Sequence, residues 1–142
     1  MVSAKFYGPG HTGGDIIVLF EKANVAHMGD LVFNRMHPFI DRPGGASIQG
    51  WITLLEQAAK AYADDTIFVF GHAGEGFKVT GTKADLQYQR DYFTALMDFT
   101  RKAKAAGQTR DVFIKTTTPL PGFADHGPLI ERTTGAAWDE LQ

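Results

Sequence analysis

Glycine-bounded turns next to short apolar runs constrain this chain more than any other feature. The first turn, Gly8–Asp15, carries His11 between glycines and leads directly into the apolar run 16–20. Glycine adopts backbone conformations that other residues avoid, and it lets a chain approach a ligand closely. A histidine on such a turn, beside a buried strand, is well placed to bind a metal or transfer protons. Taken alone, the same residues also fit an ordinary turn with an incidental histidine.

Two further turns favour the metal-binding interpretation. Asp30 follows the apolar stretch 25–28, and His72 follows the strand-like run 66–70 within the segment Gly71–Gly74. The order along the chain is therefore His, Asp, His, each expected at the end of a strand. Side chains at strand ends converge at one rim of a sheet, where the sites of α/β proteins usually lie. Imidazole with carboxylate is the ligand set expected of zinc or another first-row metal.

The segments GPGHTGGD, GDLVF and GHAG, in this order, resemble the second half of a metallo-β-lactamase-fold hydrolase. The resemblance covers roughly residues 5–107, including the stretch DRPGGASIQGW between the aspartate and the helix expected after it. It implies zinc as the cofactor, as one or two ions, with other divalent first-row metals as substitutes. By motif position, His11 and His72 each help to hold one zinc, and Asp30 bridges the two.

Two departures from the family pattern bear on activity. The family's main metal-binding run, His-x-His-x-Asp-His, should precede this segment, but the chain begins at Met1 without it. Ala73 stands where the family usually has a glycine after the last metal histidine. The resemblance therefore implies one half of a zinc-dependent hydrolase, completed by another chain or taken from a longer parent. We expect weak or no activity from this half alone, because too few ligands fix the nucleophile.

A second interpretation belongs to a different class of function, so whether the chain is an enzyme stays open. Without the missing half, one face of the sheet and much apolar surface would be exposed, which soluble monomers seldom tolerate. The half-domain would then bind metal or self-associate without being an enzyme. Two copies related by a two-fold axis would imitate the full fold. The expected partners are thus a second copy or the missing N-terminal half, and a small-molecule substrate if the protein is active.

Composition and charge exclude several other functions. A chain of 142 residues is about one domain, and 44% hydrophobic residues are enough for a core. The net charge of −2 leaves no basic footprint for nucleic acid. No apolar run is long enough to cross a membrane, and the first residues lack the apolar core of a signal peptide. We expect a soluble protein whose location the chain does not specify. The absence of cysteine excludes disulfides and thiolate ligands.

The alternation of short apolar strands with two helical periods predicts an α/β fold. We expect a mixed β-sheet with helices on one face, the αββα-type half of a metallo-β-lactamase fold. Residues 1–107 form this half-domain, and residues 108–142 form a C-terminal extension that packs on it or on a partner. The first two strands are antiparallel neighbours across a polar turn, and Ser47 and Thr82 cap the helices. The expected strands are 15–20, 24–28 and 66–70, and the expected helices are 47–63 and 83–106.

An irregular stretch, residues 33–50, follows Asp30 directly and is expected to line the site. Its candidate substrate contacts are Arg35, His37 and Phe39. We name Asp30 and His37 as the candidate catalytic residues. The favoured alternative for Phe39 and its neighbour Ile40 is that they plug the core beneath the loop.

Two further histidines are expected to play no part in the site. His27 lies within an expected strand and is more consistent with a packed residue than with a ligand. His126 precedes Gly127 and Pro128, a pattern that predicts a turn carrying a surface histidine.

Overall fold

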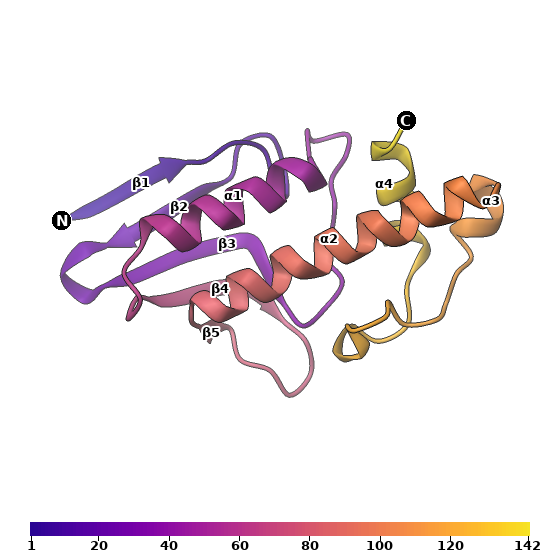
Figure 1. Cartoon of the computed structure of the whole chain (residues 1–142). Helices are drawn as coiled ribbons and strands as arrows, with labels where there is room; N and C mark the ends of the chain where they lie inside the picture. Colours follow the sequence, from indigo (N-terminus) through magenta and orange to yellow (C-terminus); the bar gives the residue numbers. More distant parts are fainter.

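A mixed five-stranded sheet, with its strands in sequence order, forms one layer of the molecule (Figure 1). The computed structural model describes residues 1–142. All neighbouring strands pair antiparallel except β3 and β4, which are parallel. The α/β class and mixed sheet expected from the sequence are confirmed. The strands are β1 (Val2–Phe6), β2 (Ile16–Phe20), β3 (Val25–Asn34), β4 (Ile67–Ala73) and β5 (Thr80–Gly81). The helices are η1 (Glu21–Ala23), α1 (Ile48–Ala61), α2 (Lys83–Ala105), α3 (Arg110–Phe113), η2 (Ala124–His126) and α4 (Glu131–Glu140).

The hairpin of β2 and β3 forms as the sequence predicts. The polar turn between the two strands is the short helix η1, and Asn24 closes it in the left-handed conformation, with φ 52°. Asparagine tolerates this conformation better than most residues, so the chain reverses without a glycine. The register pairs Val18 with His27 and Phe20 with Val25.

The strand β3 is longer than the expected strand 24–28, because it continues past a local irregularity to Asn34. Its register with β4 shifts between His27 and Gly29 and again between Gly29 and Phe33. Gly29 has φ 54°, a left-handed value that suits glycine and allows such a bulge. Asp30 and His72 therefore lie within strands, rather than after strand ends as predicted. The crossover from β3 to β4 runs through α1, as parallel pairing requires.

The two long helices begin at the residues that the sequence indicates. The Ser47 hydroxyl accepts a hydrogen bond from the Gly50 N–H at the start of α1. At the start of α2, Thr82 and Asp85 form a capping box, in which the Asp85 carboxylate accepts from the Thr82 N–H at 2.9 Å. After α2 the chain turns at Gly107, which has φ 78°.

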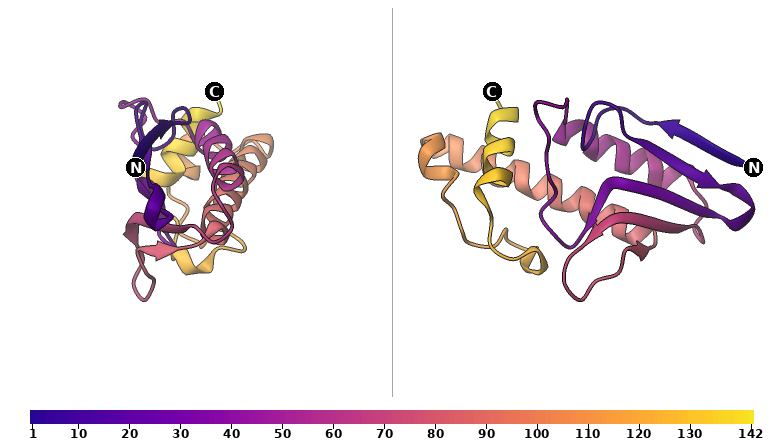
Figure 2. Two further views of the ribbon diagram at one scale, coloured as in Figure 1. Left: turned by 90° about the vertical axis from the view of Figure 1, so that its left-hand side faces the viewer. Right: turned by 180° about the vertical axis from the view of Figure 1, so that it is seen from behind.

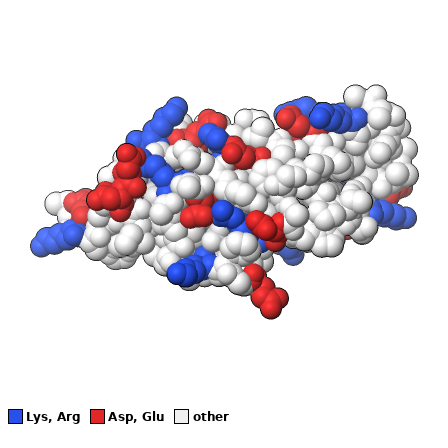
Figure 3. Space-filling view, turned by 60° about the horizontal axis from the view of Figure 1, so that its bottom comes forward, with Lys and Arg blue, Asp and Glu red and all other residues white.

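The helices α1 and α2 lie side by side on one face of the sheet and leave the other face open (Figure 2, left). The core between the two layers is rich in aromatic residues, with Trp51, Phe68 and Phe93 completely buried. Trp51 of α1 and Phe93 of α2 therefore belong to the core. No helix combines the length and apolar character needed to cross a bilayer. Acidic and basic side chains are interspersed over the face in Figure 3, without a large patch of one sign.

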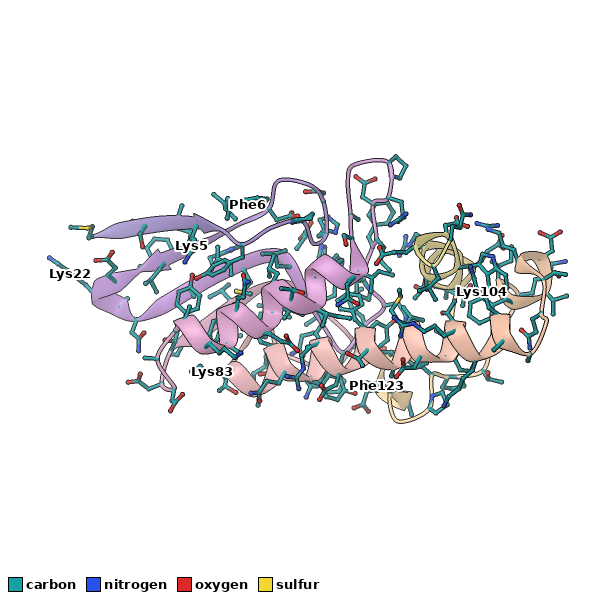
Figure 4. All side chains as sticks on the ribbon, turned by 45° about the horizontal axis from the view of Figure 1, so that its top comes forward. Lys5, Phe6, Lys22, Lys83, Lys104 and Phe123 are labelled. Carbon is teal, nitrogen blue, oxygen red and sulfur yellow. The ribbon has the colours of Figure 1, made fainter.

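Residues 108–142 pack against α2 and against the loop that follows β3 (Figure 2, right). Leu120, Leu129 and Ala137 of this segment join the main hydrophobic core. Phe123 lies against α2, where its ring contacts Tyr92, and Lys104 of α2 reaches toward α4 (Figure 4). The C-terminal segment is therefore part of the same packed unit as the sheet.

Candidate metal centre

The structure brings the three predicted metal ligands together. The Asp30 carboxylate lies between two imidazoles, with Oδ2 at 3.5 Å from Nε2 of His11 and Oδ1 at 3.1 Å from Nε2 of His72. About half of the His72 and Asp30 side chains is exposed, whereas His11 is only 12% exposed. The cluster is therefore open to solvent on one side and backed by protein on the other.

A hydrogen bond to the protein backbone fixes the orientation of His11. Its Nδ1 lies 2.7 Å from the carbonyl oxygen of Phe39. A carbonyl only accepts, so Nδ1 carries the hydrogen and the neutral ring keeps its lone pair on Nε2. The rings of Phe33, Phe39 and Trp51 surround the imidazole at centroid distances of 5.7 to 6.1 Å. The one free nitrogen therefore points at Asp30.

The bulge in β3 places Asp30 and is held by two side chains from the helices. The carbonyl of Leu31 accepts from Trp51 Nε1 at 2.8 Å and from Gln89 Nε2 at 2.7 Å. The Phe33 N–H donates to Gln89 Oε1 at 2.8 Å. Buried backbone groups that leave a strand ladder need other partners. These side chains supply them, so the carboxylate sits on a rigid section of chain.

His72 is positioned by stacking and by the glycine before it. Its ring stacks on Phe33, with 4.6 Å between centroids and an angle of 13° between planes. A Cβ on Gly71 would collide with the Asp30 carboxylate and would lie 2.8 Å from the Gly29 backbone. Glycine at this position therefore leaves the space that Asp30 occupies.

The donor set and its protonation pattern fit a bound cation. In neutral His11, the lone pair on Nε2 faces a carboxylate oxygen, an arrangement that is repulsive unless a proton or a metal ion lies between them. Two imidazoles and a carboxylate are ligands that zinc prefers. No three His, Asp or Glu side chains converge on a single position suited to one ion. Asp30 instead has one oxygen toward each histidine.

The structure does not bring His37 to this cluster, although the sequence places it among the candidate catalytic residues. His37 is buried, and its Nε2 donates to the carbonyl of Pro128 at 2.8 Å. Its Nδ1 lies 2.7 Å from the Tyr92 hydroxyl, which donates to it. Burial lowers the pKa of His37, chiefly by desolvating the charged form. Both nitrogens are engaged, so the geometry gives His37 a structural role.

Of the other candidate substrate contacts, Arg35 points away and Phe39 acts through its backbone. The guanidinium of Arg35 binds Asp85 at 2.6 Å and stacks over the Tyr88 ring at 3.7 Å. Phe39 is 41% exposed, so it does not plug the core. Its contribution is the carbonyl that fixes His11. His27 lies exposed on the open sheet face, where its Nδ1 accepts from the Gly29 N–H.

The expectation of a surface position for His126 is wrong, because this residue is buried. Its ring stacks on Tyr92 at 4.2 Å and on Tyr88 at 5.8 Å, and Nδ1 has no hydrogen-bond partner. Burial lowers the pKa of His126 to about 4, with smaller effects from His37 and Arg35. A local Gly-Pro pattern carries no information about the aromatic rings of a distant helix.

Sequence reasoning also missed the residues that hold the ligands in place. The Phe39 carbonyl leaves no trace in the sequence, since every residue has one. Gln89 carries a usable signal, because it is a polar residue at a helix position that the apolar spacing assigns to the core. Gly71 carries another, because it directly precedes a predicted ligand.

Residues 4–72 match the family model of the metallo-beta-lactamase superfamily. No curated protein matches the sequence. Among solved structures, the metallo-beta-lactamase DIM-1 is 22% identical with a TM-score of 0.54 and covers 66% of this chain. A metallo-beta-lactamase from Pontibacter korlensis is 17% identical, again with a TM-score of 0.54 and 66% coverage. The fold is therefore that of metallo-β-lactamases over about two thirds of the chain, and the match of residues 4–72 to the family model agrees with the resemblance of the three sequence segments.

The extent of these matches differs between the solved structures. The chain spans 41% of the length of each of these two metallo-beta-lactamases. The sec-alkyl sulfatase PisA1, 15% identical, superposes over 99% of this chain with a TM-score of 0.70, and the chain spans 24% of its length. The arrangement of the C-terminal segment on the sheet unit therefore has a counterpart in that fold.

Proposed function

We propose that this chain forms one half of a zinc-dependent hydrolase site, in which His11, Asp30 and His72 hold one or two metal ions. The observation that carries the proposal is the Asp30 carboxylate lying between the Nε2 atoms of the two histidines. The match of residues 4–72 to the metallo-beta-lactamase superfamily model supports it. Other divalent first-row metals suit the same donors, so zinc is the first metal to test.

Each of the three side chains has a definite task in this proposal. His11 offers Nε2 because the Phe39 carbonyl holds the hydrogen on Nδ1. Asp30 offers one oxygen toward each histidine and so acts as the bridge. His72, stacked on Phe33, offers Nε2 from the other side. Bound zinc supplies Lewis acidity and makes water acidic enough to act as a nucleophile near neutral pH.

The half-site supports little or no turnover by itself. Three protein ligands shared between two ions leave each ion with too few protein contacts to fix a nucleophile. The names of the structural neighbours provide two substrate classes for a first test, β-lactams and sec-alkyl sulfates. We expect slow or absent hydrolysis of either class by the isolated chain. Full activity requires further ligands from another chain or from the rest of a longer protein.

The zinc proposal is tested by metal analysis of the purified protein, followed by calorimetric titration of zinc into metal-free protein. We expect His72→Ala and Asp30→Asn to weaken zinc binding by about tenfold or more. The matched control is His27→Ala, an exposed histidine outside the cluster, which should bind zinc like the unmodified chain. Equal zinc uptake by the His72→Ala variant and the unmodified chain would refute the metal site.

A second proposal concerns the open face of the sheet, on which we expect a second copy of this chain to pack. The strand registers place one set of side chains on this face: Val2, Ala4, Phe6, Ile16, Val18, Phe20, Val25, His27, Ile67 and Val69. All but His27 are apolar, and several large ones are 44–60% exposed. Two sheets pack face to face through such surfaces. A symmetric pair would place two sheets inside and the helices outside, so self-association without turnover is the alternative function.

A further inference from the structure

The C-terminal segment contacts the loop after β3 at three separate points. We call residues 36–46 the site loop, and Pro128, Arg132 and Glu140 the clamp. The Pro128 carbonyl accepts from His37, and the Arg132 guanidinium lies 4.8 Å from the centre of the Phe39 ring. Glu140 binds Arg42 at 2.7 Å. The contacts fall on His37, Phe39 and Arg42, so they restrain the first part and the middle of the loop.

Glu140 is the strongest of these contacts, because its carboxylate joins three groups. Oε1 accepts from Nη1 of Arg42 and from the Ile48 N–H, both at 2.7 Å. Oε2 accepts from the Gln49 N–H at 2.8 Å. Only 11% of this side chain is exposed. A carboxylate at the N-terminus of α1 also interacts favourably with the helix dipole, so α4 fixes the point at which the site loop enters α1.

The site loop in turn holds the turn that carries His11. The Phe39 carbonyl accepts from Nδ1 of His11 at 2.7 Å. The Gly13 N–H donates to the Gly44 carbonyl at 3.0 Å. The Ser47 N–H donates to the Gly10 carbonyl at 3.1 Å. Clamp, site loop and histidine turn therefore form one continuous series of contacts.

We infer that the clamp is a positioning device for His11, and that Glu140 and Arg132 keep the Phe39 carbonyl where it fixes the histidine tautomer. The inference rests on the proposed metal site. If the carbonyl moves away, the Asp30 carboxylate draws the hydrogen of neutral His11 to Nε2. A hydrogen there occupies the lone pair that a metal needs. Outer groups that orient a ligand in this way contribute measurably to metal affinity.

The first test measures the tautomer of His11 in the metal-free protein by long-range nitrogen–proton NMR, at a pH where the imidazole is neutral. We expect the form with hydrogen on Nδ1 to predominate in the unmodified chain. Glu140→Gln and Arg132→Met, separately and together, should shift the population toward the form with hydrogen on Nε2. The single variants keep the test valid if the double variant fails to fold. An unchanged tautomer in folded variants would overturn the inference.

The matched control is Asp139→Asn, which removes an ion pair between α4 and α3; Asp139 makes its side-chain hydrogen bonds to Arg110 and none to the site loop. Asp139 binds Arg110 at 2.8 and 2.9 Å, so the control loosens α4 at its contact with α3 instead. We expect the His11 tautomer to stay unchanged in this control, even where its melting temperature falls as far as that of Glu140→Gln. An equal tautomer shift in the control would show that the tautomer responds to any loss of stability in α4, and it would overturn the inference.

Zinc titration separates this inference from the proposed function. We expect the dissociation constant for zinc to rise about threefold to tenfold in Glu140→Gln and in Arg132→Met, and to stay unchanged in Asp139→Asn. If the unmodified chain takes up no zinc, the proposed function fails, while the tautomer measurement still decides the clamp. If all these proteins bind zinc equally and share one His11 tautomer, the inference about the clamp is refuted and the proposed metal site is supported.

Discussion

The indole Nε1 of Trp51 donates a hydrogen bond to the carbonyl of Leu31, the residue that directly follows Asp30. The same carbonyl accepts from Gln89 on the neighbouring helix. Both helices thus reach through the core to the one stretch of β3 that leaves regular pairing with β4. The position of the central carboxylate therefore depends on two buried side chains from outside the site.

The first prediction concerns Gln89. Replacing it by leucine, of similar size, leaves the buried Phe33 N–H without its partner and removes one of two donors to Leu31. An unsatisfied buried backbone group costs about 1–3 kcal/mol, so we expect the free energy of unfolding to fall by about 2–3 kcal/mol. Chemical denaturation measures this loss. Gln87→Leu, at an exposed position of the same helix, should change stability by less than about 0.5 kcal/mol. Equal stability of the two variants would contradict this role.

The second prediction concerns the space beside Asp30. In Gly71→Ala, the added methyl group collides with the Asp30 carboxylate and with the Gly29 backbone. We expect zinc affinity to fall about tenfold or more, as for other residues that orient ligands. Overpacking should also cost about 1–3 kcal/mol of stability. The control Gly14→Ala meets no atom within 4 Å and should leave both quantities unchanged. Calorimetric titration that found the same zinc affinity in both variants would refute the steric argument.

The third prediction concerns pH and the buried His126. Its ring lies against Tyr88 and Tyr92 of α2, with His37 of the site loop and the positive charge of Arg35 nearby. Because burial lowers its pKa to about 4, the unfolded chain takes up this proton first as the pH falls below 6.5. The contribution of neutral His126 to the free energy of unfolding is therefore fully present above pH 6.5. It decreases as the pH falls, and the loss reaches about 3 kcal/mol at about pH 4.

Denaturation curves between pH 7 and pH 4 measure this effect, and His126→Phe is the informative variant. Phenylalanine keeps the aromatic stacking but cannot titrate, so the decrease in stability toward pH 4 should be smaller by the same amount. The control His27→Gln, at an exposed position, should retain the full decrease. Parallel pH profiles for His126→Phe and the unmodified chain would show that His126 does not contribute.

The fourth prediction concerns the open sheet face. In light scattering at micromolar concentration, we expect the chain to have about twice its own mass of 15.6 kDa. Ile67→Lys places a charge on the open face, where Ile67 is 52% exposed, and should yield a monomer. Val112→Lys makes the same kind of change on α3, where Val112 is 60% exposed, and should leave the mass unchanged. A clean monomer for the unmodified chain would contradict association through this face.

Local sequence signals predicted most of the fold. The caps at Ser47 and Thr82 and the apolar spacing set the two long helices to within about two residues of their observed ends. The strand β3 was harder to predict, because Gly29 and Asp30 interrupt the apolar alternation that marks a strand. The bulge is stabilised by side chains far away in the sequence, so no local pattern shows that the strand continues.

The candidate site was likewise predictable only where short local motifs specify it. The motif positions of His11, Asp30 and His72 predicted their convergence, since each follows from a resemblance over a short segment. The positions of His37 and His126 could not be predicted for one reason: both are buried by contacts between the site loop, α2 and the C-terminal segment. His37 and Pro128 are 91 residues apart in the sequence, and the residues around either one give no sign of their contact.

The clamp contacts the site loop but lies far from it along the sequence, and this affects the order of folding. Every strand pairs with its neighbour in the sequence, so the sheet closes only short or moderate stretches of chain. Arg42 and Glu140, by contrast, are 98 residues apart. Contacts between distant residues form late, because a large loss of chain entropy precedes them. We therefore expect the sheet to assemble first and the loop that orients His11 to settle last, so that high-affinity metal uptake marks the completion of folding.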